Sequence, residues 1–127
     1  MIMQNSVIDL IIRIKNGYMA RRESIDVSSS HFNEAVLMKL MQLGFIKKFQ
    51  AKDRIIQVEL LYKERNAAIT DVQIFSKPGR RYYVSYKDLK PVLGGLGYSI
   101  ISTSKGIFSN KEARKRKLGG ELLFSIW

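Results

Sequence analysis

Apolar side chains recur at helical spacing near the start of the chain. Between residues 5 and 19 they fall every three or four positions, at Val7, Ile11, Ile14 and Tyr18. This period predicts an amphipathic helix. Asn5 or Ser6 is placed to cap its start, because both side chains accept hydrogen bonds from free helix amides.

A second helical stripe and three β-like segments complete the first half. The stripe predicts a helix over 31–43, with the serines of 28–30 as candidate N-caps and Gly44 as a left-handed C-cap. Strands are predicted over 24–27, 45–51 and 54–62, where apolar and polar positions alternate. The first half is therefore expected to be α-β-α-β-β, a layer of helices on a small sheet.

The second half is predicted to be mostly β, with short helices. We expect strands over 67–76, 81–86, 98–103, 107–108 and 121–127, and short helices over 87–92 and 111–117, the latter capped by Asn110. Lys77-Pro78-Gly79-Arg80 is typical of a turn. The charged segment 63–66 marks the predicted boundary between two subdomains, 1–64 and 65–127. The fold class is then α+β, with the two subdomains packed as one body.

A polar turn lies between two of these strands, at Ser102-Thr103-Ser104-Lys105-Gly106. Hydroxyl side chains are compact and uncharged, and they both donate and accept hydrogen bonds. Beside a lysine they suit close approach to another polar backbone. Taken alone, however, the five residues fit a solvated hairpin tip better.

Positive charge is concentrated in the second half. The 127 residues include 22 Lys and Arg against 11 Asp and Glu, a net charge of +11 with a pI near 10. Residues 61–127 hold 13 basic and 5 acidic residues, net +8, against net +3 for residues 1–60. On a chain that is 46% hydrophobic, this excess indicates a folded protein that binds a polyanion, with nucleic acid ahead of an anionic membrane surface.

Several kinds of chemistry are excluded or disfavoured. Without cysteine there is no disulfide, thiolate metal site or cysteine nucleophile, and the single histidine, His31, has no second histidine with which to share a metal. The glycines of 94–97 lack the surroundings of a phosphate-binding loop. Ser104 and Lys105 are expected on opposite faces of a strand, which disfavours a catalytic dyad. We predict no catalytic residue, metal or cofactor, and we recognise no targeting segment or membrane span.

Two further segments carry side chains suited to RNA. Residues 111–117 hold five basic side chains in seven positions, of which Arg114, Lys115 and Lys117 are predicted to contact phosphates. In the strand over 81–86, Arg81 and Tyr83 share one face while Tyr82 points to the other, into the core. Tyr83 can stack on an unpaired base. A half-buried tyrosine with a wet hydroxyl explains that residue equally well.

Several motifs occur in a characteristic order. They are Ile8-x-x-x-Ile12-Arg13-Ile14-Lys15-Asn16-Gly17, Ser29-Ser30, Gly44-Phe45-Ile46, Ser76-Lys77-Pro78-Gly79-x-Arg81, Gly95-Leu96-Gly97, Ser102-Thr103-Ser104-Lys105-Gly106 and Leu118-Gly119-Gly120-Glu121. In this order the chain resembles the bacterial-type small-subunit ribosomal protein S-eight family over nearly its whole length. The serine-rich motif and the glycine-glycine-glutamate motif are the most specific.

The resemblance implies direct binding to the central domain of small-subunit ribosomal RNA during assembly, next to neighbouring small-subunit proteins. It implies that Ser102, Thr103, Ser104 and Lys105 enter the minor groove of an irregular RNA helix, and that Gly106 allows the close approach. It also implies that Tyr83 and Glu121 lie beside the same RNA. A-form RNA exposes its 2′-hydroxyls in a shallow minor groove, where compact hydroxyl side chains fit.

The chain departs from the family pattern at four places, one of which is the short link between two strands at Lys52-Asp53. The other three are substitutions. Asn5-Ser6 stands where the family often has Asp-Pro, His31 and Asn33 stand where lysines are usual, and 84–86 replaces a commonly basic run. The second of these substitutions weakens the expectation of phosphate contacts by the first subdomain.

We therefore expect a ribosome-bound structural protein without catalytic activity, in a bacterial cytoplasm or in an organelle. The alternative is a free-standing RNA-binding translational regulator that acts on a messenger which mimics the ribosomal RNA site. A third possibility is a structural protein that binds mainly other proteins. Its complexes should stay intact after nuclease treatment.

Overall fold

The computed structural model describes residues 2–127, and the side chains from residue 7 onward. Within this range the chain forms two compact units, Ile2–Thr70 and Asp71–Trp127. The predicted boundary after residue 64 falls inside the first unit. Each unit combines helices with antiparallel strands, which confirms the α+β class.

Helix α1 (Ile2–Met19) begins before the predicted start, so Asn5 and Ser6 are helical positions and the capping prediction was wrong. Their side chains lie outside the described part of the structure. The apolar stripe is buried as predicted, with Leu10 added to it. Gly17 allows close packing against β1 (Ser24–Ser28), because a Cβ at this glycine would lie 2.7 Å from Cγ2 of Ile25.

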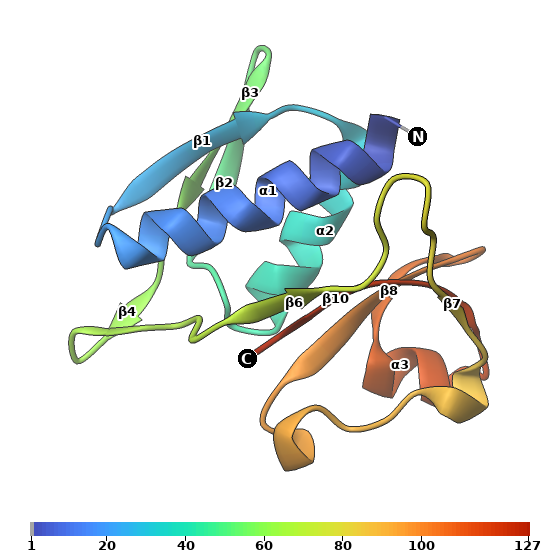
Figure 1. Ribbon diagram of the computed structural model, residues 1–127. Coiled ribbons are helices and arrows are strands. Elements are labelled where there is room, and N and C mark those ends of the chain that lie inside the picture. The colour runs from blue at the N-terminus through green and yellow to red at the C-terminus, as the bar shows by residue number, and fades with distance from the viewer. Residues whose placement is uncertain (1) are drawn as a thin grey trace. The chain divides into compact units, whose positions relative to one another are not determined.

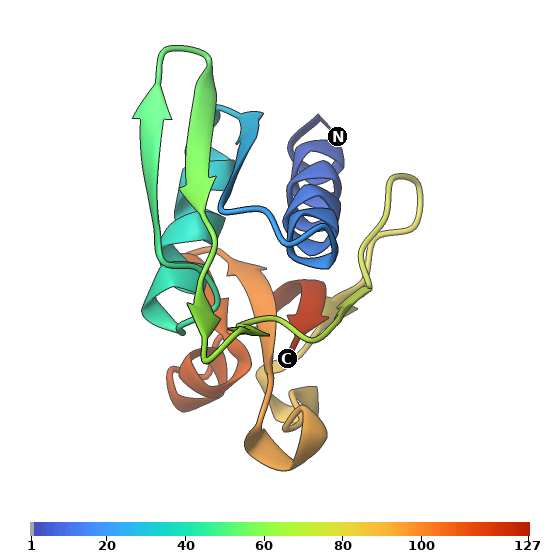
Figure 2. The same ribbon diagram turned by 90° about the vertical axis from the view of Figure 1, so that its left-hand side faces the viewer.

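Three antiparallel strands form the sheet of the first unit, in the order β1-β3-β2. Strands β2 (Lys48–Lys52) and β3 (Ile55–Glu59) make a hairpin whose turn projects at the top of Figure 2. Helix α2 (His31–Gln42) is capped by Ser30, whose hydroxyl accepts a hydrogen bond from the Asn33 amide. Helix α1 contacts both α2 and β1 (Figure 1). The order α-β-α-β-β is thus confirmed for residues 2–59.

A short hairpin follows where the sequence predicted only a charged break. Strands β4 (Tyr62–Lys63) and β5 (Asn66–Ala67) pair across Glu64 and Arg65, and both of these residues have positive φ, 51° and 70°. Two successive residues with positive φ suit the tight turns that join antiparallel strands. The strand predicted over 67–76 is correspondingly limited to β6 (Val72–Ile74).

The second unit is built around its last strand, β10 (Gly120–Ile126). The sheet order is β6-β10-β8-β9, and β7 (Tyr83–Val84) also pairs with β10. Strands β8 (Tyr98–Thr103) and β9 (Gly106–Ser109) form the predicted hairpin around the polar turn.

Two predicted elements of the second unit are shorter or different in kind. The strand over 81–86 reduces to β7, and the helix over 87–92 is replaced by the single-turn 3₁₀ helix η1 (Tyr86–Asp88). A proline follows at 91. Its ring disfavours helical backbone angles at the residue before it, which opposes a helix across this position. A second single turn, η2 (Leu93–Gly95), precedes β8.

Helix α3 (Asn110–Lys115) packs on β8 and closes the core of this unit. That core contains Leu89, Ile101, Ala113 and Leu122. The predicted cap was wrong by one residue, because Ser109 and Glu112 form a capping box. The side chain of Asn110 instead accepts from the Ser99 amide at 3.2 Å and donates to the Lys90 carbonyl at 3.0 Å.

Candidate nucleic-acid interface

Three predicted site residues form a row across neighbouring strands of the second unit. Glu121 on β10 pairs with Ser102 on β8 and, on its other side, with Tyr83 on β7. Paired residues of antiparallel strands project from the same face of a sheet. The structure therefore brings Tyr83, Glu121 and Ser102 together, although they are distant in sequence.

The glycine pair before Glu121 makes this row possible. A Cβ on Gly119 would lie 2.6 Å from the Val84 carbonyl oxygen, and a Cβ on Gly120 would collide with the Ser102 carbonyl oxygen. Neither glycine has positive φ, so they are required here for space rather than for backbone conformation. Without side chains at these positions, the start of β10 fits between β7 and β8.

The turn that follows Ser102 uses one hydroxyl for itself and presents the next two side chains. The Thr103 hydroxyl donates to the Gly106 carbonyl at 2.8 Å and accepts from the Lys105 amide at 3.1 Å. Ser104 and Lys105 are exposed at the tip. Gly106 has φ of 128°, a backbone conformation that side chains disfavour. Thr103 thus organises the turn, while Ser104 and Lys105 are available to a ligand.

Arg81 reaches the same row through an ion pair. Its Nη1 lies 3.5 Å from Oε2 of Glu121, and the two side chains are only 23% and 16% exposed. The hydroxyl of Ser76 donates to the same carboxylate oxygen. Arg81 and Glu121 are therefore joined to each other rather than projecting independently into solvent.

Of two neighbouring tyrosines, Tyr82 differs from its prediction, while Tyr83 fits one of the two readings that the sequence allowed. Tyr82, expected in the core, is 45% exposed, and its ring packs on Phe75 with centroids 5.4 Å apart. Tyr83 is 70% exposed, which disagrees with the alternative of a half-buried ring. An exposed aromatic ring beside polar groups can stack on a base.

The basic side chains of α3 and the turn after it fall into two groups. Arg114 donates to the Leu89 carbonyl at 2.7 Å, and the Arg116 guanidinium lies 4.7 Å from the Phe108 ring centroid. These contacts hold both arginines against their own unit. Arg114, Lys115 and Lys117 are all exposed. Of these three predicted phosphate ligands, only Arg114 is held by such a contact in the described part of the chain.

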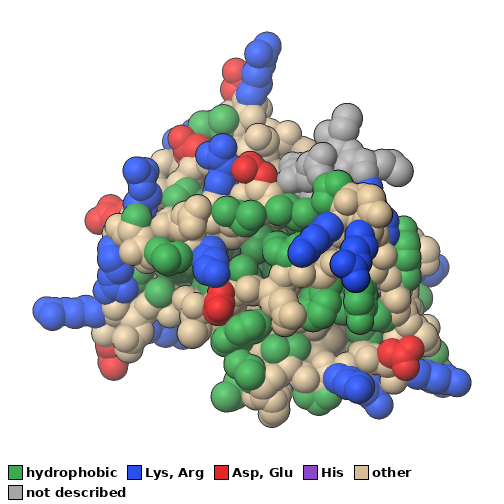
Figure 3. All heavy atoms as spheres, viewed as in Figure 1, with side chains coloured by type: hydrophobic (Ala, Val, Ile, Leu, Met, Phe, Trp, Pro, Cys, Tyr) green, Lys and Arg blue, Asp and Glu red, His purple; other side chains and the backbone are tan. Residues whose placement is uncertain are grey.

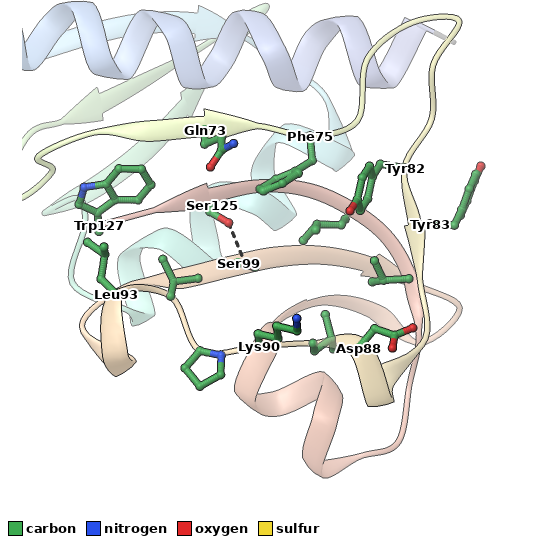
Figure 4. A pocket seen from close by; sticks show the side chains of 15 residues that line it. Gln73, Phe75, Tyr82, Tyr83, Asp88, Lys90, Leu93, Ser99, Ser125 and Trp127 are labelled. Carbon is green, nitrogen blue, oxygen red and sulfur yellow. Dashed lines mark hydrogen bonds between the residues drawn. The ribbon is translucent and has the colours of Figure 1, made fainter.

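A groove of about 630 Å³ lies on the same unit (Figure 4). Phe75 and Tyr82 lie at one end and Trp127 and Leu93 at the other, while the Tyr83 ring points away from it. The hydroxyls of Ser99 and Ser125 in its lining bond to each other at 2.9 Å. Figure 3 shows apolar side chains exposed among polar ones on the visible face, with Lys and Arg side chains projecting from its margins.

Sequence reasoning included Ser76 in the motif Ser76-Lys77-Pro78-Gly79-x-Arg81 but gave it no role at this site. Its side chain bonds Glu121 and also accepts from the Tyr82 amide at 3.2 Å. The only signal was its place immediately before a Lys-Pro-Gly turn. Over residues 2–127, no three acidic or histidine side chains gather as a metal site, and no helix is long and apolar enough to cross a membrane.

A basic α+β chain with a hydroxyl-rich turn, an exposed tyrosine and projecting lysines is typical of proteins that bind nucleic acid. Comparison with known proteins identifies the family. Residues 5–127 match the model of the family described as Ribosomal protein S8, and the chain belongs to that family.

Curated relatives cover all or nearly all of the chain. The small ribosomal subunit protein uS8 of Dictyoglomus turgidum is 43% identical over 131 residues, which is 100% of both chains. That of Caldanaerobacter subterraneus subsp. tengcongensis is 42% identical over 134 residues, again 100% of both. That of Caldicellulosiruptor bescii is 44% identical, over 95% of this chain and 96% of its own. These relatives are bacterial ribosomal proteins.

Proposed function

We propose that this chain is a structural constituent of the small ribosomal subunit, where it binds the central domain of the ribosomal RNA directly and supports its assembly. Family membership supports the ribosomal assignment. The observation that carries direct RNA binding is the row of Tyr83, Glu121 and Ser102 beside the exposed Ser104-Lys105 tip. The chain acts as a binding protein without catalysis, and its partners are RNA and neighbouring ribosomal proteins.

The polar turn supplies the closest contacts in this proposal. The minor groove of A-form RNA is wide and shallow, and it displays 2′-hydroxyls that both donate and accept hydrogen bonds. Ser102, Ser104 and the Lys105 ammonium approach this groove, while Thr103 and Gly106 hold the backbone of the turn in shape. A rigid turn loses little conformational freedom on binding, which favours affinity.

Other residues extend the contact around the turn. Tyr83 stacks on an unpaired base or a sugar, and Arg81 with Glu121 forms the polar floor between Tyr83 and Ser102. Lys115 and Lys117, with Arg114 at the edge, face phosphates and add affinity without sequence information.

The test replaces the tip of the turn, Ser104→Ala with Lys105→Ala. We expect binding to a transcript of the central domain of small-subunit ribosomal RNA to weaken by about 10- to 100-fold, because each of the two lost polar contacts is worth about 0.7 to 1.4 kcal/mol. The melting temperature should barely move, since both side chains are exposed. Affinity is measured by filter binding and stability by circular dichroism.

The matched control is Arg54→Ala. Arg54 is a cation in the two-residue turn between β2 and β3, so this variant also loses one positive charge from a hairpin tip. It should bind within about 2-fold of the wild type, the scale of one screened charge. Equal losses in both variants, or a melting temperature that falls with affinity in the Ser104 variant, would reject the turn as the binding element.

A further inference from the structure

Ser76 joins three segments of the proposed RNA surface through one buried hydroxyl. Its side chain is 2% exposed. The hydroxyl donates to Oε2 of Glu121 on β10 and accepts from the backbone amide of Tyr82, which precedes β7. A buried hydroxyl that is satisfied on both its donor and acceptor sides has one preferred orientation.

The same residue closes the base of a basic hairpin. Lys77 and Arg80 exchange two backbone hydrogen bonds of 3.0 and 3.1 Å, which makes a tight loop between Ser76 and Arg81. The amides of Phe75 and Ser76 both donate to the Leu123 carbonyl, at 3.0 and 3.3 Å. The first arm of the loop is therefore fixed to β10, and the Ser76 hydroxyl connects it to the second arm.

Glu121 is the one acidic side chain in the row that faces the RNA. A free carboxylate would repel the phosphate backbone. In the structure this carboxylate meets both the Arg81 guanidinium and the Ser76 hydroxyl. These two donors fix its direction, and Arg81 offsets its charge.

We propose that Ser76 is a positioning residue for RNA binding. Its hydroxyl orients the Glu121 carboxylate, so that Arg81 pairs with that carboxylate and lies level with Tyr83 and Ser102. Ser76 itself is buried and does not touch the RNA. This inference rests on the proposed function, because it assigns a role in building the same surface.

The experiment uses the full chain with Ser76→Ala and the same ribosomal RNA transcript. We expect binding to weaken by about 10-fold, the scale of one polar contact with the RNA that is lost when Glu121 and Arg81 are no longer held in place. Ser76→Thr keeps the hydroxyl and should restore affinity to within about 3-fold of the wild type. Binding is measured at 25 °C, where circular dichroism confirms that each variant is folded.

A double-mutant cycle with Glu121→Gln separates positioning from simple stabilisation. If Ser76 acts through the carboxylate, Ser76→Ala should change affinity by less than about 2-fold once that charge is removed. In NMR spectra of the free protein, the Arg81 side-chain Nε–H signal should also shift in Ser76→Ala. A purely structural Ser76 would lower the melting temperature and leave both the affinity of the folded protein and the Arg81 signal unchanged.

The outcomes separate this inference from the proposed function. The positioning role is overturned if Ser76→Ala binds RNA with wild-type affinity. It is also overturned if Ser76→Ala loses the same affinity with and without Glu121→Gln. RNA binding by the turn still stands in both cases. If the wild-type chain fails to bind the transcript, or if Ser104→Ala with Lys105→Ala binds as well as the wild type, the proposed function fails and the positioning role fails with it. If Ser76→Thr does not fold, the double-mutant cycle and the NMR signal still show whether Ser76 is a positioning residue.

Discussion

Tyr18 shows how a single buried hydroxyl connects segments of the first unit. Its hydroxyl donates to the Phe45 carbonyl at 2.6 Å and accepts from the Leu61 amide at 3.0 Å. The ring packs edge-on against Tyr62, with centroids 5.4 Å apart. Helix α1 is thereby tied to the segments before β2 and after β3. The helical period predicted that Tyr18 is buried, but it did not predict these partners, because they come from distant residues.

Replacing Tyr18 with Phe should lower the free energy of unfolding by about 2 kcal/mol at neutral pH. The ring is kept, and the loss comes from the two hydrogen bonds that the Tyr18 hydroxyl makes at a buried position. Urea unfolding measures this difference. Tyr62→Phe is the control, because its hydroxyl makes a single hydrogen bond, to the Arg22 carbonyl at an exposed position, and its loss should cost less than about 1 kcal/mol.

The difference in stability between Tyr18→Phe and the wild type should depend on pH in alkaline solution. Burial raises the pKa of Tyr18 above its usual value. Above a pH of about 10 the unfolded tyrosine ionises while the folded one stays protonated, so the unfolded state binds fewer protons and stability falls as pH rises. Tyr18→Phe has no hydroxyl to ionise and lacks this pH dependence. Its deficit in free energy of unfolding relative to the wild type should therefore shrink above pH ~10. A deficit that stays constant with pH would contradict the buried, protonated hydroxyl.

At the scale of elements, α3 and the turn after it carry Arg114, which is bound to a carbonyl of its own unit, and the exposed Lys115 and Lys117. Lys115→Ala with Lys117→Ala should reduce the slope of log Kd against log salt by about 1 to 2, because each phosphate contact releases roughly one counterion. Stability should change little, since both side chains are exposed. Affinity is measured over a series of potassium chloride concentrations.

Arg114→Ala provides the contrast on the same helix. Its guanidinium is bound to the Leu89 carbonyl at 2.7 Å. Its loss should therefore lower the melting temperature more than the two-lysine variant does, and should change the salt slope less than that variant does. The opposite pattern, with a steep change in slope for Arg114 and none for the two lysines, would mean that α3 presents a different side to the RNA.

Elements with a strong local signal could be predicted, and elements that depend on a distant partner could not. The helical stripes of α1 and α2, the alternation in β3 and the polar turn between β8 and β9 all appear where expected. The strand predicted over 81–86 is limited to the two residues of β7, which pair with β10, so its length could not be predicted from local sequence. Such pairing depends on tertiary context more than on intrinsic strand preference.

The candidate site follows the same division. The serine-rich turn and the glycine pair were recognisable as motifs, and the structure explains the glycines by the close approach of Val84 and Ser102. The Thr103 hydroxyl makes its hydrogen bonds within the turn, and this depends on the geometry of the turn. The place of Ser76 depends on β10, which lies far along the chain. Local sequence does not specify either role.

For the whole molecule, the distribution of charge over the two units bears on how RNA is bound. Residues 71–127 hold 11 basic and 4 acidic side chains, net +7, while residues 2–70 hold 11 and 7, net +4. Both units are therefore attracted to RNA, but the excess is larger on the unit that carries the polar turn. A chain with a net charge of +11 also binds polyanions without specificity at low salt.

Salt should therefore distinguish a ribosomal constituent from a protein that only adheres to RNA. We expect the chain to sediment with small ribosomal subunits and to remain bound at about 0.5 M salt, where contacts that rest on counterion release alone are strongly weakened. The Ser104→Ala, Lys105→Ala variant keeps most of the charge and should sediment at low salt but wash off at high salt. Western blots of gradient fractions give the measurement.

Each alternative function predicts a different distribution in the same gradient. A free-standing regulator would stay near the top or travel with messenger fragments, whether or not the polar turn is intact. A protein held mainly by other proteins would remain in a large complex after nuclease treatment, whereas a chain held through ribosomal RNA should be released. Persistent absence from small subunits would favour the regulator. Release by nuclease, together with loss of the variant at high salt, would tie assembly into the subunit to the RNA contact made by this turn.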